Sequence, residues 1–495
     1  MQDSRQRRAN PLTTATTSLL AAAEASVQTH SAELRKELGI IDLILAQILA
    51  VVVPDFFGTA VLAGPAHVVL WLLAIVLFFI PEGLVVAHLN RLMPLEGGLY
   101  EWARLAFNDG IGFLVAWNIW LFGTLYAAVI GFVATTFLAY VLGPRAAWMA
   151  ASPWGILLAS IVFFTALMLF ASLGLRIGKW VTNAGCVVVL ITLGVLILSP
   201  ILGRHRGTLP DYHPLRLVTP PLTFFSLSLF SKMTFGALTS LEYVAIFAGE
   251  TRNPARNYRR SILIAAPIIA LLYIFGTSAI LCFVSPDSLD VIGPIPQALS
   301  RGSDFSGLAR IIAPIAILLL LANYFSSFCL NFAANSRLPM VAGWDHLLPE
   351  WFTRLHPRFK TPVNSILFIG AVAVGAVIAA LVGVGAQEAY ELLLTWSFAF
   401  YGLAYLAMFA IPILARRDRG LRPRLWLRLA AGSGFLVTFV FVLLSVFPII
   451  EVKNRNAYSL KSIAIIMGAN AFGFLVYRLG KQRPLPNSVT CSTTL

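Results

Sequence analysis

Twelve apolar segments, each about as long as a bilayer-spanning helix, run through this chain of 495 residues. A helix needs about 20 residues to cross the hydrocarbon core, whereas a membrane β-strand needs only about ten. Backbone polar groups in hydrocarbon must pair within their own segment, so these lengths predict helices. We expect an all-α polytopic membrane protein with twelve transmembrane helices. They lie at 39–63, 66–88, 109–141, 154–173, 180–203, 222–248, 261–285, 309–333, 363–383, 389–413, 427–449 and 459–478.

The loop charges predict how the chain crosses the bilayer. Of the 36 Lys and Arg, 26 lie in the tails and in alternate loops or the segment ends beside them, 9 lie on the other side, and Lys232 lies well inside a segment. Because cytoplasmic loops carry the excess of basic residues, we expect both termini in the cytoplasm and the protein in the cytoplasmic (inner) membrane. The net charge of +14 then reflects topology. The basic stretch 416–428 is interpreted in the same way, so the expected partners are the lipid bilayer and a small molecule, with no nucleic acid.

The first apolar segment is interrupted at its centre by VVVPDFF, residues 51–57. Pro54 removes a backbone donor and clashes with the carbonyl group of Ala50, which should break the helix. A carboxylate such as that of Asp55 costs about 2.5 to 3.5 kcal/mol at the middle of a bilayer on insertion scales. Such a group normally faces a partner, a cavity or a substrate. The segment therefore predicts a binding site.

The sixth segment is expected to be discontinuous as well. Lys232 and Glu242 flank a cluster of residues that weaken a helix, Thr234, Gly236, Thr239 and Ser240. Breaks in segments one and six predict a five-plus-five inverted repeat with its substrate near the midplane. The expected organisation is a flexible tail at 1–38, a transport core at 39–413 with repeats at 39–203 and 222–413, two additional helices at 427–478, and a tail at 479–495.

Enzymatic chemistry has little support in this sequence. The seven histidines are scattered, at 30, 67, 88, 205, 213, 346 and 356, without the spacing of a metal site or of an acyl-transfer site. We expect no enzyme activity, no metal and no cofactor, and the sequence leaves open whether H⁺ or Na⁺ drives transport.

Four further segments carry a family resemblance: ELGIIDLIL (37–45), MPLEGGLYEW (93–102), GETRNPARNYRRSI (249–262) and NSRLPMVAGWDHLLPEWFTRLHPRFKTP (335–362). Their residues, order and spacing resemble the amino acid–polyamine–organocation permeases. The resemblance implies a secondary active transporter that moves amino acids or related organic amines by alternating access. The alternatives are a polyamine or organic-cation transporter, a channel, and a non-transporting amino acid sensor of the same fold.

The resemblance also implies which residues form the site. In the family, the ammonium and carboxylate groups of the substrate meet the unwound backbone of helices one and six. The matching positions here are Val53, Pro54, Asp55, Phe56, Phe57, Gly236, Leu238, Thr239 and Ser240. Asn118 and Tyr126 are further candidates for the pathway. The candidates for coupling or gating are Asp55, Lys232, Glu242, Ser326, Ser327 and Asp345.

The roles of the ionisable residues stay open at this point. Asp55 is interpreted as the N-cap of the outer half-helix, as a ligand of the substrate's ammonium group, or as an acid neutralised by a proton or by Lys232. Lys232 either extends toward an outer vestibule or pairs with an acid. Glu242 is interpreted as a structural acid or a coupling group, and Glu82 as a packing contact.

Overall fold

The structure is a computed structural model. It describes residues 39–93, 98–173, 178–205, 215–242, 254–303, 309–341, 350–354, 356, 361–414 and 423–481. These residues form helices and no strand. The helices up to residue 205 are α2 (Ile40–Val51), α3 (Asp55–Val61), α4 (His67–Ala74), α5 (Ile80–Leu92), α6 (Leu99–Ala106), α7 (Asp109–Ala127), α8 (Ile130–Leu142), α9 (Ala147–Ala151), α10 (Pro153–Leu173) and α11 (Gly178–His205).

The later helices follow the same pattern of long apolar elements. They are α12 (Phe224–Leu238), α13 (Pro254–Leu281), α14 (Pro294–Ser303), α15 (Ala309–Val341), α16 (Glu350–Thr353), α17 (Val363–Leu381), α18 (Ala386–Leu414), α19 (Leu425–Ser445) and α20 (Arg455–Lys481).

Among the described residues, ten helices are long and apolar enough to span a membrane, and the bent pair α2 and α3 adds an eleventh if it forms one span. The shorter apolar helix α12 covers the start of the predicted segment 222–248, whose last residues lie outside the described part of the chain. The all-α polytopic class is therefore confirmed. The count of twelve spans, the inverted repeat and the domain boundaries stay predictions.

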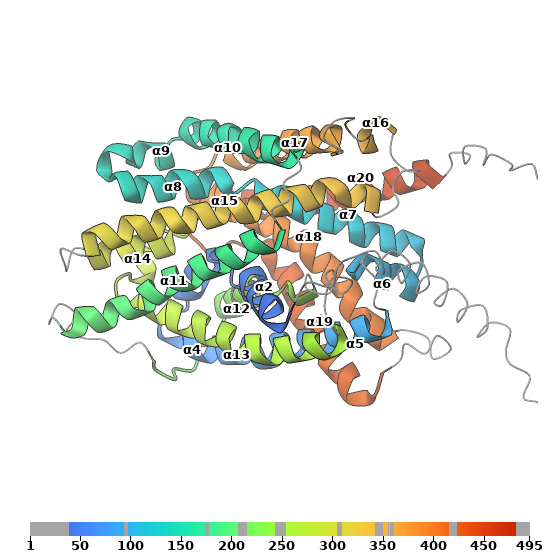
Figure 1. Ribbon diagram of the computed structural model, residues 1–495, viewed down its shortest axis with the longest axis horizontal. Helices are drawn as coiled ribbons and strands as arrows, with labels where there is room; N and C mark the ends of the chain where they lie inside the picture. Colours follow the sequence, from blue (N-terminus) through green and yellow to red (C-terminus); the bar gives the residue numbers. More distant parts are fainter. Residues whose placement is uncertain are drawn as a thin grey trace, which may run out of the picture. The chain divides into compact units, whose positions relative to one another are not determined.

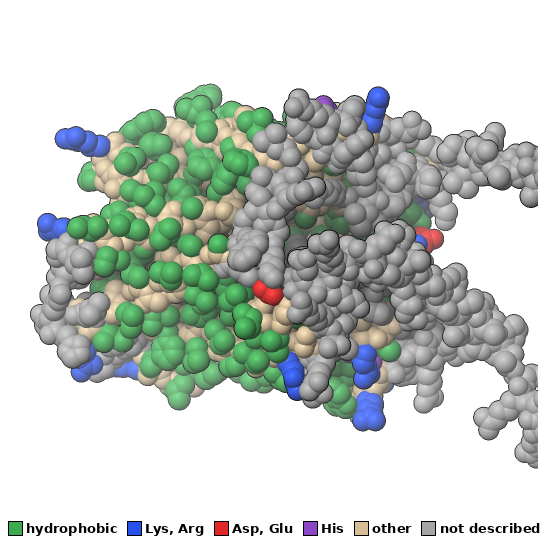
Figure 2. Space-filling model, in the orientation of Figure 1, with side chains coloured by type: hydrophobic (Ala, Val, Ile, Leu, Met, Phe, Trp, Pro, Cys, Tyr) green, Lys and Arg blue, Asp and Glu red, His purple; other side chains and the backbone are tan. Residues whose placement is uncertain are grey.

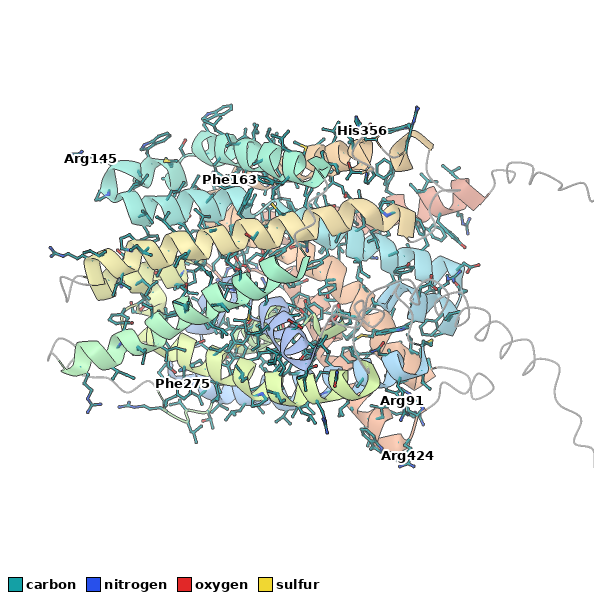
Figure 3. All side chains as sticks on the ribbon, viewed as in Figure 1. Arg91, Arg145, Phe163, Phe275, His356 and Arg424 are labelled. Carbon is teal, nitrogen blue, oxygen red and sulfur yellow. The ribbon has the colours of Figure 1, made fainter. Side chains whose placement is uncertain are left out.

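The chain divides into two compact units. The first comprises residues 1–112, 182–289 and 405–443, and the second comprises 113–181, 290–404 and 444–495. In the first unit, α2 and α3 both pack against α13, and α3 also packs against α12 (Figure 1). Hydrophobic side chains cover the visible faces of α13 and α11 (Figure 2). Phe275, which points away from α13, is one of them (Figure 3).

One helix of the first unit is irregular at its centre. Between α4 and α5 the chain makes a π-helical turn, Ile75–Phe79, and Pro81 lies two residues after it. Because proline has no N–H, the carbonyl group of Leu77 lacks its helical donor. The Ser433 hydroxyl of α19 donates to that carbonyl at 2.6 Å. The irregular turn therefore has a partner outside its own helix, and Glu82 lies three residues after its end.

The second unit is built on α8, α10, α15 and α17: α10 packs against the other three, and α15 also packs against α8 and α17. Gly131 of α8 lies so close to Ser160 of α10 that a Cβ atom there would be 1.9 Å from the Ser160 hydroxyl. Gly370 of α17 likewise faces Met168 of α10. Close approach of helices at small residues is the usual packing mode in membranes.

Candidate functional site

The first helix breaks at the predicted place. α2 ends at Val51, α3 begins at Asp55, and the two are bent by 56°. Pro54 offers no donor to the Ala50 carbonyl, so the last turn of α2 keeps a carbonyl without its helical partner. The N–H groups of Phe56 and Phe57 donate to the carbonyl groups of Val53 and Pro54, both at 3.3 Å. The start of α3 thus satisfies two of its own donors in a tight turn.

The N-cap position, one of the roles considered for Asp55, is occupied by Pro54. Pro54 already has helical angles, with φ −60° and ψ −26°, and is itself the N-cap, so Asp55 is the first residue of α3. The carboxyl group is nevertheless 2% exposed and interacts electrostatically with Tyr273 of α13. Asp55 is therefore a buried acid in the first turn of a half-helix, where the helix dipole favours a negative charge.

The Tyr273 hydroxyl joins the two broken helices. It accepts a hydrogen bond from the Val53 N–H at 3.0 Å, and it lies 2.8 Å from the Val51 carbonyl oxygen and 3.0 Å from the Ala237 carbonyl oxygen. Val51 and Val53 belong to the first break, and Ala237 lies in the last turn of α12. One phenol therefore fixes backbone groups of both breaks.

Two glycines let α3 approach its neighbours. A Cβ atom at Gly236 of α12 would lie 1.9 Å from the Phe56 ring, and one at Gly276 of α13 would lie 2.4 Å from the Phe57 ring. Real side chains do not reach such distances, so both positions require glycine while the rings stay in place. The predicted residues 53–57 and 236–240 are thus brought together.

The sixth-segment break follows Leu238, the last residue of α12. Thr239 is extended, and Ser240 has φ +89°, a left-handed conformation that is costly for a residue other than glycine. The backbone N–H groups beyond the break are held by side chains from other helices. The Ser240 N–H donates to the Tyr405 hydroxyl of α18 at 2.8 Å, and the Leu241 N–H donates to Oε1 of Glu82 at 3.2 Å.

Two acids meet at this second break. The Tyr405 hydroxyl donates to Oε1 of Glu82 at 2.9 Å and also lies within hydrogen-bond distance of Oε2 of Glu242. Glu82 is fully buried, and Glu242 is 5% exposed. Oε2 of Glu82 is buried without a hydrogen-bond partner among the described residues. The interpretation of Glu82 as a packing contact therefore has to be replaced, because its carboxyl group holds the unwound backbone.

The other predicted residues have varied surroundings. Lys232 is 5% exposed, so its side chain is buried in the first unit rather than extended to solvent. Asn118 donates to Asn470 at 2.9 Å, and Tyr126 stacks on Phe122; all four belong to the second unit. The Ser326 hydroxyl donates to the Ala322 carbonyl within its own helix, as packing hydroxyls do. Ser327 is half-buried, and Asp345 lies outside the described residues.

The sequence interpretation missed Tyr273 and Tyr405. Each is a tyrosine inside an otherwise apolar span, which is a weak signal because aromatic residues are common there. Glu82 offered a stronger one, since an acid directly after a proline within a span carries the same cost as Asp55. Among the described residues, no cluster of His, Cys, Asp or Glu is suited to a metal ion.

The sequence of this chain matches a known protein family. The amino acid permease model matches residues 39–470. The chain belongs to the amino acid permease family. An uncharacterized transporter of Legionella pneumophila is 25% identical over 90% of this permease and 97% of its own length. A probable agmatine/putrescine antiporter of Lactococcus lactis is 23% identical over 88% of this permease and 93% of its own length. A branched-chain amino acid permease of the same species is 27% identical over 63% of this permease and 69% of its own length. The permease is accordingly an integral membrane transporter of amino acids or amines and not an enzyme.

Proposed function

We propose that the substrate is an organic amine, bound through its ammonium group at the break between α2 and α3. Asp55 and the carbonyl groups at the C-terminus of α2 receive the cation. The single observation that carries the proposal is the occupation of the backbone donors. The N–H groups of Val53, Phe56, Phe57, Ser240 and Leu241 already have acceptors within the protein, and Pro54 has no N–H.

A substrate carboxylate needs such donors, whereas an ammonium group needs acceptors. Half-helix C-termini present carbonyl groups that favour cations, and α2 ends in this way beside the buried Asp55. A carboxylate 4 Å from Asp55 would meet about 4 kcal/mol of repulsion at an effective dielectric of 20. The probable agmatine/putrescine antiporter among the relatives supports an amine, and the branched-chain amino acid permease supports the competing assignment.

The test is ligand binding to the purified protein, measured as a shift in thermal unfolding with agmatine, putrescine or leucine. A ligand at about 100 times its Kd adds about 2.7 kcal/mol to the free energy of unfolding. We expect agmatine or putrescine to raise the unfolding temperature, and leucine to leave it unchanged.

Asp55→Asn is expected to weaken amine binding about 10- to 100-fold, because a charge-assisted hydrogen bond contributes about 1.5 to 3 kcal/mol. Asp42→Asn, which changes an acid at the start of α2, is the matched control and should bind like the wild type. Stabilisation by leucine alone would reject the amine assignment and leave the family assignment intact.

We further propose that the protein lies in the cytoplasmic membrane with both termini in the cytoplasm. The distribution of 26 basic residues against 9 supports this topology. Arg91 at the end of α5 and Arg424 before α19 lie at the same end of the first unit, as the topology requires (Figure 3). Single cysteines at residues 210 and 420 should react with an impermeant reagent from outside and from inside respectively. The opposite labelling pattern would contradict the topology.

A further inference from the structure

The carboxyl groups of Glu82 and Glu242 share one phenol at the second break. Glu82 comes from α5, Glu242 follows α12, and Tyr405 comes from α18. All three side chains are buried, and the phenol oxygen is within hydrogen-bond distance of both carboxyl groups. We call these three residues the acid cluster. None of them belongs to the proposed amine contacts.

The single hydrogen of the phenol limits how the acid cluster can be hydrogen-bonded. The Tyr405 oxygen accepts one hydrogen bond, from the Ser240 N–H, and carries one hydrogen of its own. That hydrogen can be donated to one carboxyl oxygen only. The second carboxyl oxygen makes a hydrogen bond to the phenol only if it brings a hydrogen itself. Both contacts to the phenol are satisfied when one of the two glutamates is a neutral carboxylic acid.

The electrostatics of the acid cluster favour the same state. Two ionised carboxylates at one buried site repel each other, so such pairs hold a proton between them. Glu242 acts electrostatically on Glu82 in this structure. The buried Oε2 of Glu82, which has no hydrogen-bond partner among the described residues, is an open position for that proton.

Other ionisable groups lie on the helices of the same unit. They include Asp55 on α3, His67 on α4, Lys232 on α12, Tyr273 on α13, His88 and Arg91 further along α5, and Arg428 on α19. Asp55 acts on Tyr273, at the first break. The acid cluster at the second break is thus a separate pair of acids.

We propose that Glu82, Tyr405 and Glu242 form the proton-binding site that drives transport. The proton adds to one carboxylate to form the neutral acid, and it leaves as the same proton, so no other bond changes. The protonated cluster holds the Ser240 and Leu241 N–H groups and fixes the second break. Loss of the proton leaves two ionised carboxylates beside one phenol. Their repulsion separates the acids and releases the unwound backbone. The proposal adds a driving ion and does not depend on the substrate class.

The test uses the full-length protein in proteoliposomes, with the membrane potential clamped at zero and with both putrescine and leucine as substrates. A gradient of one pH unit supports up to about tenfold accumulation when one proton moves with each substrate. We expect Glu82→Gln to reduce this accumulation to about onefold while exchange of internal for external substrate continues. Glu391→Gln, a buried acid elsewhere on α18, is the matched control and should accumulate like the wild type.

Two results would overturn the proposal. One is pH-driven accumulation by Glu82→Gln at the wild-type level. The other is loss of exchange together with accumulation in a correctly folded variant, because Glu82 would then serve binding or structure rather than coupling. If Glu82→Gln does not fold, Tyr405→Phe replaces it and is judged by the same two measurements. If the amine assignment is wrong, the protein should transport leucine and not putrescine, and the pH dependence of accumulation should stay the same.

Discussion

The two helix breaks have different physical origins. The break between α2 and α3 lies at a proline, which removes the donor for Ala50, and the first turn of α3 satisfies its own N–H groups. The break after α12 contains no proline. Its Ser240 has φ +89°, and its N–H groups are held by Tyr405 and Glu82 from other helices. Pro54 sets the position of the first break locally, with Tyr273 as an added tertiary contact, whereas the second break depends on tertiary contacts.

This difference indicates which break is able to move. A proline fixes its break in every conformation of the protein, because the missing N–H cannot be restored. The contacts at the second break are hydrogen bonds to side chains, which can be released and remade. We therefore expect the first break to be the constant part of the site and the second to change during transport.

The largest effect on stability and transport is expected from Tyr273→Phe, which removes the hydroxyl that joins the two breaks. It leaves the Ala237 carbonyl without the hydroxyl 3.0 Å away, whereas the Val53 N–H keeps the Val51 carbonyl as an acceptor at 2.9 Å. A buried group without its partner costs about 1 to 3 kcal/mol, so thermal unfolding in detergent should occur at a lower temperature. Transport should fall as well.

The matched control is Tyr140→Phe, which removes a hydroxyl bonded to Asp290 in the second unit. It is expected to lower stability without reducing substrate exchange. If Tyr273→Phe exchanged substrate at the wild-type rate, the Tyr273 hydroxyl would not be needed to hold the two breaks together for transport.

A smaller effect on stability is expected from Ser240→Gly, which removes backbone strain from the second break. Glycine adopts φ +89° without the steric cost of a side chain, about 1 to 2 kcal/mol for an L-residue in the left-handed region. The variant should therefore unfold at a slightly higher temperature. Thr239→Gly, at φ −86°, is the neighbouring control and should unfold at a lower one. Equal shifts for both would show that Ser240 carries no strain.

The sequence predicts the locally encoded features well. The apolar segments predict the helical class, and Pro54 locates the first break between Val51 and Asp55. Small polar residues indicate the second break only approximately. The contacts that hold the breaks join residues far apart in the chain, Val53 with Tyr273 and Leu241 with Glu82. No local pattern specifies such pairs, so Glu82 was misinterpreted and both tyrosines were missed.

The π-helical turn Ile75–Phe79 has a consequence for the register of its helix. Such a turn contains one more residue than an α-helical turn, and each residue advances the helix by about 100°. Trp71, before the turn, donates to Thr277 of α13, while Glu82, after it, reaches the Leu241 N–H. If one residue of the turn were deleted, the helix beyond it would rotate by about that angle and Glu82 would face another direction. A single inserted residue thus sets which face of this helix carries the acid.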